Sequence, residues 1–204
     1  MSRPGTIRIP SRADEHFHMT VSAPLYRRLM GNSWGQLAEP IQSMHATSSI
    51  VRACGQLRID YGPHPVARLL ARLLRLPHPS PAADTRLVVS ARGDRERWER
   101  TFDGRRFATL QYRWHDDLAE RFGVLQFRFR LHVSDGSLLY IQRQAAVLCW
   151  PVPFPIPAFC APRVEAREDR AGPKRVQVEV RVVLPGIGLL ISYAGIVEVE
   201  ENGR

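Results

Sequence analysis

Hydrophobic and polar residues alternate along most of the chain between residues 84 and 200. A period of two is typical of β-strands that bury one face. The clearest run covers residues 124–133, in which every second residue is apolar. Residues 50–61 alternate more loosely and predict one earlier strand, with Gly55 a candidate for a bulge.

The connections between these strands are short. Asp103-Gly104 and Asp135-Gly136 are strong signals for two-residue hairpin turns, and Gly186-Ile187-Gly188 predicts a third hairpin. Short connections force neighbouring strands to run antiparallel. The pattern therefore predicts a meander of about eight or nine strands, which curls into a half-barrel or barrel because a long twisted sheet does not stay flat.

Two segments interrupt the alternation. Residues 116–121 are polar and predict a crossing between strands, at most one helical turn. Residues 150–159 contain four prolines within seven residues, which excludes a helix or a central strand and predicts an extended apolar loop. The loop at 185–190 is apolar as well, so we expect the two loops to pack on each other or to dock on a membrane or a partner.

A helical period is found in the N-terminal part of the chain and again before the main run of strands. Ser22, Pro24 and Gly31 bracket one short helix, and a second is expected from Trp34 to His45. Residues 65–76 predict an amphipathic helix with its leucines on one face. Its apolar stripe consists of Val66, Leu69, Leu70, Leu73 and Leu74, with Arg68, Arg72 and Arg75 outside the stripe.

These elements predict an α+β fold. We expect the N-terminal helices and the amphipathic helix to pack on the concave face of the curved sheet, because apolar helix faces need a cover. In this interpretation residues 22–204 form a single domain, and residues 1–21 form a flexible polar tail.

The composition is that of an ordinary globular domain, with 44% hydrophobic and 24% charged residues among 204. No run of eighteen uncharged apolar residues and no apolar N-terminal segment occurs, so neither a transmembrane helix nor a signal peptide is predicted. Cys54, Cys149 and Cys160 lack metal-type spacing, and we expect buried, inert thiols in a reducing cytoplasm.

The net charge is +9, from 29 basic and 20 acidic residues, and every basic residue except Lys174 is an arginine. Such an excess favours anionic lipid or nucleic acid. No arginine cluster with interleaved aromatics forms a nucleic-acid-binding motif, so we do not expect nucleic acid as a partner. A solvated arginine-rich surface is one interpretation, and peripheral membrane contact through Arg68, Arg72, Arg75 and the apolar loops is the other.

Large aromatic side chains recur at positions assigned to the inner face of the sheet. A curved sheet lined in this way either encloses an apolar ligand or fills its hollow with a packed core. The candidate ligand-binding residues are Trp98, Phe102, Tyr112, Trp114, Phe127, Phe129, Tyr140 and Tyr193.

Recognisable catalytic patterns are missing from the sequence. It has no Gly-x-Ser-x-Gly elbow, no Gly-x-Gly-x-x-Gly loop and no short metal-type spacing, so we assign no catalytic residue, metal or cofactor. A cofactor-independent enzyme would have to turn His132 or the pair Asp116-Asp117 into the hollow. His45, like the other histidines that flank helices, is expected at the surface or at a helix cap.

Several motifs are spread over residues 24–200. They are the segment from Leu25 to His45, the leucine-rich helix ending at Leu76-Pro77, the strand Arg97–Phe102 with Phe107, the segment Ala161–Ala166 and the segment Leu184–Gly195. In this order they resemble the bacterial family named domain of unknown function 4166. The family has no assigned activity, so the resemblance implies no catalytic residue. Members are sometimes joined to a saccharopine-dehydrogenase-like or other Rossmann-type reductase domain, and we expect such a partner to be a separate protein here.

We therefore expect the domain to bind a lipid-like or other apolar small molecule in the hollow of its curved sheet. Two alternatives stay open. One is an accessory role beside a Rossmann-type reductase, and the other is catalysis without a cofactor.

Overall fold

The computed structural model describes residues 23–46, 50–149 and 152–200. The tail predicted over residues 1–21 lies outside them. In chain order the elements are α1 (Leu25–Met30), the 3-10 helix η1 (Gly31–Gln36), α2 (Glu39–His45), β1 (Ile50–Tyr61), α3 (Pro65–Leu73), β2 (Ser80–Arg92), β3 (Arg95–Phe102), β4 (Arg105–Trp114), β5 (Asp117–Phe122), β6 (Leu125–Ser134), β7 (Ser137–Cys149), β8 (Val152–Pro155), β9 (Arg163–Arg170), β10 (Arg175–Leu184) and β11 (Gly188–Val199).

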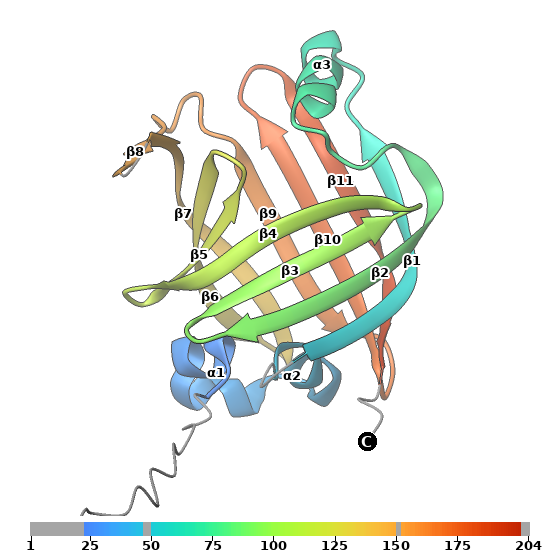
Figure 1. Ribbon diagram of the computed structural model, residues 1–204, viewed down its shortest axis with the longest axis vertical. Coiled ribbons are helices and arrows are strands. Elements are labelled where there is room, and N and C mark those ends of the chain that lie inside the picture. The colour runs from blue at the N-terminus through green and yellow to red at the C-terminus, as the bar shows by residue number, and fades with distance from the viewer. Residues whose placement is uncertain (1–22, 47–49, 150–151, 201–204) are drawn as a thin grey trace, which may run out of the picture.

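The described strands form one antiparallel sheet that closes on itself (Figure 1). Neighbours follow the order β6-β5-β4-β3-β2-β1-β11-β10-β9-β7, and β6 also pairs with β7, so these ten strands make a closed barrel. β8 adds an eleventh strand that pairs with the end of β7. The predicted antiparallel barrel is confirmed, whereas the predicted eight or nine strands are too few.

Two of the predicted hairpin turns join neighbouring strands of the barrel. Asp103 and Asp135 have φ angles of 46° and 51°, and Gly104 and Gly136, which follow them, both have φ of 81°. Two successive residues with positive φ give the turn whose twist matches that of paired strands. The local sequence therefore sets the pairing of β3 with β4 and of β6 with β7.

β5 and β8 are the two strands that the sequence analysis missed. β5 lies where a polar crossing was expected, and its inward positions are Leu118, Glu120 and Phe122. A charged side chain at an inward position hides the alternation. β8 lies in the proline-rich segment. Its prolines have no N–H to donate, and the strand tolerates them because it pairs with β7 alone.

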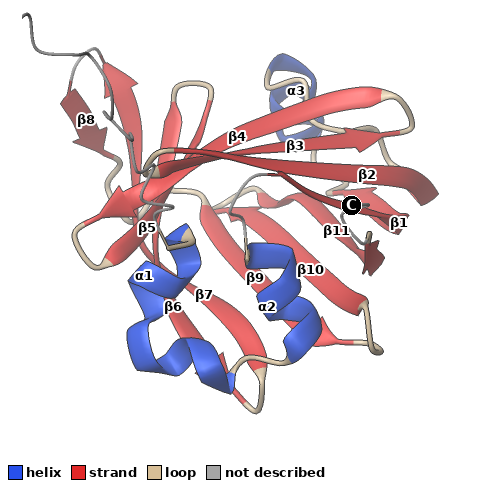
Figure 2. Cartoon of the chain, turned by 60° about the horizontal axis from the view of Figure 1, so that its bottom comes forward, coloured by secondary structure: helices blue, strands red, loops and turns tan. Residues whose placement is uncertain are grey.

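The helices lie at the two ends of the barrel, so their predicted placement on a concave sheet face is wrong. α1, η1 and α2 close one end (Figure 2), where Leu25, Tyr26, Ile41 and Met44 are buried in the main core. α3 lies at the other end, against β11 (Figure 1). The concave side of a closed barrel is its interior, which leaves only the ends to cover with helices.

α3 also turns a different face towards the barrel than the sequence predicts. Ala67 and Ala71 are buried, whereas Leu69 and Leu73 are 55% and 69% exposed. The small alanine side chains let the helix lie close to the barrel. Most of the predicted leucine stripe therefore faces solvent.

Gly55 and Gly195 allow β1 and β11 to approach each other closely. A Cβ atom on Gly55 would overlap the backbone oxygen of Ile196, and Gly195 is confined in the same way by β1. The bulge considered at Gly55 is not found there, because Gly55 pairs in register with both neighbouring strands. The register shift between β1 and β2 lies between Leu57 and Ile59.

The barrel wall is least complete where β7 meets β9, because only the residues from Leu138 to Tyr140 pair there with β9. Beyond them, the side chain of Gln142 joins the two strands. Its Nε2 donates to the backbone oxygen of Pro162 at 2.8 Å, and its Oε1 accepts from the N–H of Val164 at 2.6 Å. One side-chain amide thus replaces two backbone hydrogen bonds.

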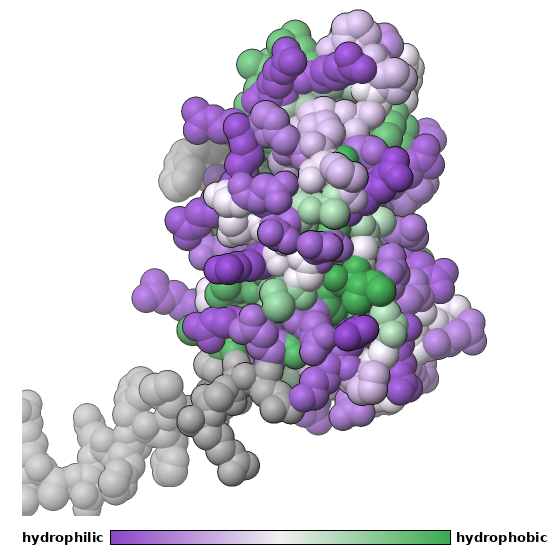
Figure 3. Space-filling view, turned by 90° about the vertical axis from the view of Figure 1, so that its right-hand side faces the viewer, coloured by the Kyte–Doolittle hydropathy of each residue, from purple (hydrophilic) through white to green (hydrophobic). Residues whose placement is uncertain are grey.

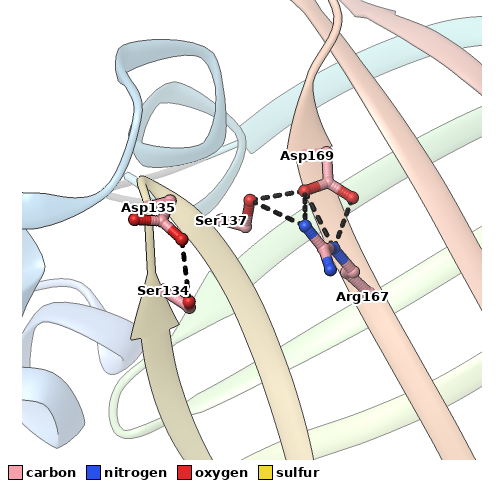
Figure 4. A network of polar contacts seen from close by, with 5 residues as sticks. All are labelled: Ser134, Asp135, Ser137, Arg167 and Asp169. Carbon is pink, nitrogen blue, oxygen red and sulfur yellow. Dashed lines mark hydrogen bonds and ion pairs between the residues drawn. The ribbon is translucent and has the colours of Figure 1, made fainter.

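The helices α1, η1 and α2, which close one end of the barrel, are here called the helical plug. A polar cluster closes the junction of β7 and β9 on the side of this plug (Figure 4). Arg167 Nε and Nη2 donate to the carboxylate of Asp169 at 2.7–2.9 Å, and Ser137 Oγ donates to the same carboxylate. The Arg167 hydrogen bonds are the first cause that lowers the pKa of Asp169 below its ordinary value, against the opposing effect of burial. The cluster therefore holds the first residue of β7 to β9.

Candidate functional site

The barrel encloses a cavity of about 380 Å³. The cavity extends from Met44 of α2 to Leu70 and Leu74 of α3, and its wall consists mainly of inward-facing apolar side chains. A ring of about eight strands is already wide enough to hold one small ligand, so side chains do not fill a ring of ten. The volume lies in the range of roughly 300–1,000 Å³ that is typical of small-molecule sites.

Most of the aromatic residues predicted at the site line this cavity. Those that do are Trp98, Phe102, Phe127, Phe129, Tyr140 and Tyr193. The inward orientation predicted for Tyr112 and Trp114 is wrong, because the inner positions of β4 are Phe107, Thr109 and Gln111. Aromatic residues occupy the outer face of β4, where Tyr112 donates to Gln126 at 2.8 Å. The expectation that the large aromatic residues of this strand lie on its inner face was therefore wrong.

A charged pair lies inside the cavity. Arg100 Nη1 donates to Thr109 Oγ1 at 3.2 Å and lies 3.8 Å from Glu120 Oε1, and the guanidinium lies over the ring of Trp98 at 5.1 Å. Burial, the largest single influence, lowers the pKa of Arg100, but the charges of Tyr193, Glu120, Tyr26 and Tyr140 together outweigh it and the pKa is raised. The guanidinium therefore stays charged, and Glu120 balances that charge.

Arg100 retains hydrogen-bonding capacity for a ligand. A guanidinium has five N–H donors, and among the described side chains the bond to Thr109 uses one of them. Its side chain is 16% exposed although it lies within the barrel wall, because this surface faces the cavity. Burial raises the pKa of Tyr193, which also lines the cavity, so its hydroxyl stays protonated. The middle of the cavity thus offers donors within apolar surroundings.

A second polar group, here called the floor cluster, lies at the α1–α2 end of the cavity. It consists of Tyr26, His45, Gln111, Tyr140 and Glu168. Tyr140 donates to Glu168 Oε1 at 2.8 Å, and His45 Nε2 lies 2.7 Å from Glu168 Oε2. Tyr26 donates to Gln111 Oε1 at 2.9 Å and lies 3.2 Å from the hydroxyl of Tyr140. Because Tyr26 and His45 come from α1 and α2, the cluster fastens the helical plug to the barrel.

The tyrosines of the floor cluster act as hydrogen-bond donors. Burial raises the pKa of Tyr26 and of Tyr140 well above the ordinary value, and the charge of Glu168 adds to this effect. His45 is fully buried, and its Nδ1 has no hydrogen-bond partner among the described residues.

Glu96 of β3 lies beside the floor cluster and is 1% exposed. Its Oε2 accepts from Trp98 Nε1 at 3.2 Å, and its Oε1 has no partner in the part of the chain that the structure describes. Burial raises the pKa of Glu96, and His45, Trp98 and the backbone N–H of Leu25 oppose this only in part. A carboxyl group is thus held in the interior with an incomplete set of partners.

Comparison with protein families gives a match to the family described as a domain of unknown function (DUF4166), over residues 37–196. The match spans most of the chain and includes β1 to β10 and most of β11. The chain belongs to the DUF4166 family. No curated protein and no solved structure matches the chain. The resemblance predicted from the motifs is therefore confirmed, and the family description assigns this DUF4166 domain no activity.

The groups that a cofactor-independent enzyme was expected to turn inward lie outside the cavity of this DUF4166 domain. His132 is exposed on β6, Asp116 is exposed in a turn, and Asp117 accepts from Arg130 at 2.8 Å on the outer face. Other ionisable groups reach the interior of the barrel. Besides the tyrosines already described, they include His45, Glu96, Arg100, Glu120, Arg167 and Glu168.

The sequence contains signals that would have located some of these groups. His45 was expected at the surface, but it follows Ile41 by one helical turn and lies on the buried side of α2. Glu120 and Glu168 continue the inward alternation of their strands by position, although their charge suggests the opposite. Position along the strand, rather than residue type, is the signal that places them inside.

The three cysteines were expected to be buried, and this prediction is wrong because all three are exposed. Cys54 lies between Ala53 and Gly55, which face inward, and therefore belongs to the outer face of β1. Within the described residues, no three or more His, Cys, Asp and Glu side chains are placed to hold a metal ion. None of the described helices has the length and apolar character needed to cross a membrane.

Proposed function

We propose that this DUF4166 domain binds an uncharged, elongated apolar molecule inside its barrel. The observation that carries the proposal is the unfilled cavity of about 380 Å³, whose apolar wall runs from the floor cluster to α3. An apolar volume that side chains leave unfilled costs packing energy, and an apolar molecule that occupies it restores the lost contacts.

The charged pair in the cavity indicates which polar feature the ligand carries. The charged residues that line the cavity are Arg100, Arg167, Glu120 and Glu168, so the interior has no excess positive charge to attract an anion. A carbonyl or hydroxyl oxygen accepts a hydrogen bond from Arg100 without adding a charge that would have to be desolvated. The preferred ligand is therefore a long-chain ester, ketone or alcohol rather than a carboxylate.

Filling the cavity tests the binding site directly. Val180 lines the cavity from β10, and Val183 on the same strand faces outward and is half-buried as well. Val180→Trp is expected to abolish the fluorescence gain of Nile red, an uncharged apolar dye, whereas Val183→Trp is expected to leave it unchanged. Equal binding by both variants would show that the dye binds elsewhere and would contradict the proposal.

Replacing the charged pair tests the polar feature of the ligand. The double variant Arg100→Leu with Glu120→Leu leaves no unpaired charge inside the barrel. Displacement of Nile red by a long-chain methyl ester and by an alkane of equal length gives the selectivity for the carbonyl group. We expect the preference for the ester over the alkane to be roughly tenfold greater in the wild type than in the double variant. This factor is in the range of a hydrogen bond to a charged group. An unchanged ratio, or tighter binding of a fatty-acid anion than of its ester, would exclude the assigned role of Arg100.

A further inference from the structure

α3 exposes apolar side chains at the end of the barrel where the cavity reaches the surface. Val66, Leu69 and Leu73 are 41%, 55% and 69% exposed, whereas their neighbours Leu70 and Leu74 line the cavity. Val124, in the turn between β5 and β6, lines the cavity and is also exposed. The opposite end is closed by the helical plug, so this end is the entrance.

Further exposed apolar residues lie at the same end. β7 runs from the plug towards the α3 end, so β8 and the loop after it are found there too (Figure 1). Val152, Phe154 and Phe159 in this segment are more than half exposed. Figure 3 shows hydrophobic side chains at the upper end of the molecule, where Figure 1 places α3, and a second hydrophobic patch lower on the side of the barrel, among side chains that are mostly hydrophilic. The entrance is thus surrounded by side chains that water solvates poorly.

The charge of the entrance segment is positive. Residues 62–79 contain Arg68, Arg72 and Arg75 and no acidic residue. All three arginines are exposed. Exposed leucines next to arginines are typical of a helix that lies in the interface of an anionic membrane, where leucines enter the acyl region and arginines contact the headgroups.

Arg75 occupies a position that favours glycine. Its φ is 53°, in the left-handed region, directly after α3. The N–H of Leu76 donates to Ala71 O at 2.9 Å and that of Arg75 to Arg72 O at 3.0 Å, which is the helix-ending pattern that normally has glycine at this site. The other non-glycine residues with positive φ are in hairpin turns between strands, so Arg75 alone among the described residues takes this strain at a helix end. We take this strain as an indication that the Arg75 side chain has a function.

We propose that the α3 end of the barrel docks on an anionic lipid surface, and that the apolar ligand enters the cavity from that surface. Val66, Leu69 and Leu73 insert among the lipids, and Arg68, Arg72 and Arg75 contact the phosphates. The inference that the ligand enters from the lipid surface rests on the proposed function, whereas the inference that the α3 end docks there does not.

Flotation with lipid vesicles tests this inference. The full chain is expected to float with vesicles of phosphatidylcholine and phosphatidylglycerol, and to be released by salt, but not to float with phosphatidylcholine alone. Arg75→Gly is expected to weaken binding about fivefold, the factor for one arginine near an anionic surface, while its melting temperature stays equal or rises. The double variant Leu69→Ser with Leu73→Ser is expected to weaken binding at least tenfold, because two buried leucines contribute more than one charge.

Matched controls separate docking from general surface effects. Arg52→Gln removes an exposed arginine near the plug, and Ile196→Ser removes an exposed apolar side chain of the barrel wall. Both are expected to bind vesicles like the wild type.

Three results would each overturn the docking proposal: equal losses of binding in the controls, no flotation of the wild type, or a protein dimer that the Leu69 and Leu73 changes dissociate. Nile red added from solution is expected to bind all these variants equally, so a failure of docking and a failure of ligand binding are told apart.

Discussion

The titration of Glu96 links the stability of the fold to pH. Because burial raises its pKa, the folded protein retains a proton that the unfolded chain has already released, and stability falls as the pH rises from the ordinary carboxyl pKa to the raised one. Glu96→Gln removes this titration, and its amide oxygen still accepts from Trp98. We expect the variant to be more stable than the wild type at neutral pH, with the gain shrinking towards about pH 4, where carboxyl groups are protonated in both states. Urea unfolding at a series of pH values measures this, and a gain that does not vary with pH would contradict it.

Gln142 is the residue that completes the barrel wall between β7 and β9. Gln142→Ala removes both of its hydrogen bonds and is expected to cost about 1–3 kcal/mol, because the N–H of Val164 loses its partner. Hydrogen exchange at Val164 is expected to accelerate. Gln142→Glu, which can still accept from Val164 but cannot donate to Pro162, is expected to protect that N–H. If Val164 exchanges equally fast in all three proteins, the side chain does not close the wall.

At the scale of elements, the described helices and most strands could be predicted from local pattern, but the exceptions have definite physical causes. β5 was missed because Glu120 occupies an inward position, and β8 because its prolines fit only a strand that pairs on one side. α3 was predicted at nearly the right residues, but its buried face was not. A helix can use Ala67 and Ala71 for close packing and leave its leucines exposed, and periodicity alone does not distinguish these arrangements.

The close contact between the paired strands β1 and β11 can be tested by substitution at Gly55. Gly55→Ala is expected to destabilise the barrel by about 1–3 kcal/mol, because the added Cβ overlaps the backbone of β11. Gly35→Ala is the matched control, since nothing lies within 4 Å of a Cβ built there. It is expected to be neutral or to stabilise by up to about 1 kcal/mol. Thermal unfolding of the two variants compares them, and equal stabilities would show that β1 can move away from β11.

The molecule as a whole is a ten-stranded barrel with a helical plug at one end and an apolar entrance at the other. The short connections predict the antiparallel curvature but not the closure. β7 closes the ring because it pairs with β6 along most of its length and with β9 through Leu138 to Tyr140, while its last residues pair with β8. The same non-local pairing decides which side chains meet inside. Arg100 and Glu120 lie on strands separated by β4, and no local pattern brings them together.

Trp98 can report directly whether an uncharged apolar molecule occupies the barrel. This side chain lines the cavity, and the other tryptophans, Trp34, Trp114 and Trp150, can be replaced by phenylalanine to leave it as the only indole. Titration with a long-chain methyl ester that carries bromine, which quenches indole fluorescence on contact, then reports occupancy. We predict saturable quenching of Trp98 at one ester per chain. Unquenched Trp98 fluorescence at ester concentrations that saturate Nile red displacement would contradict the account.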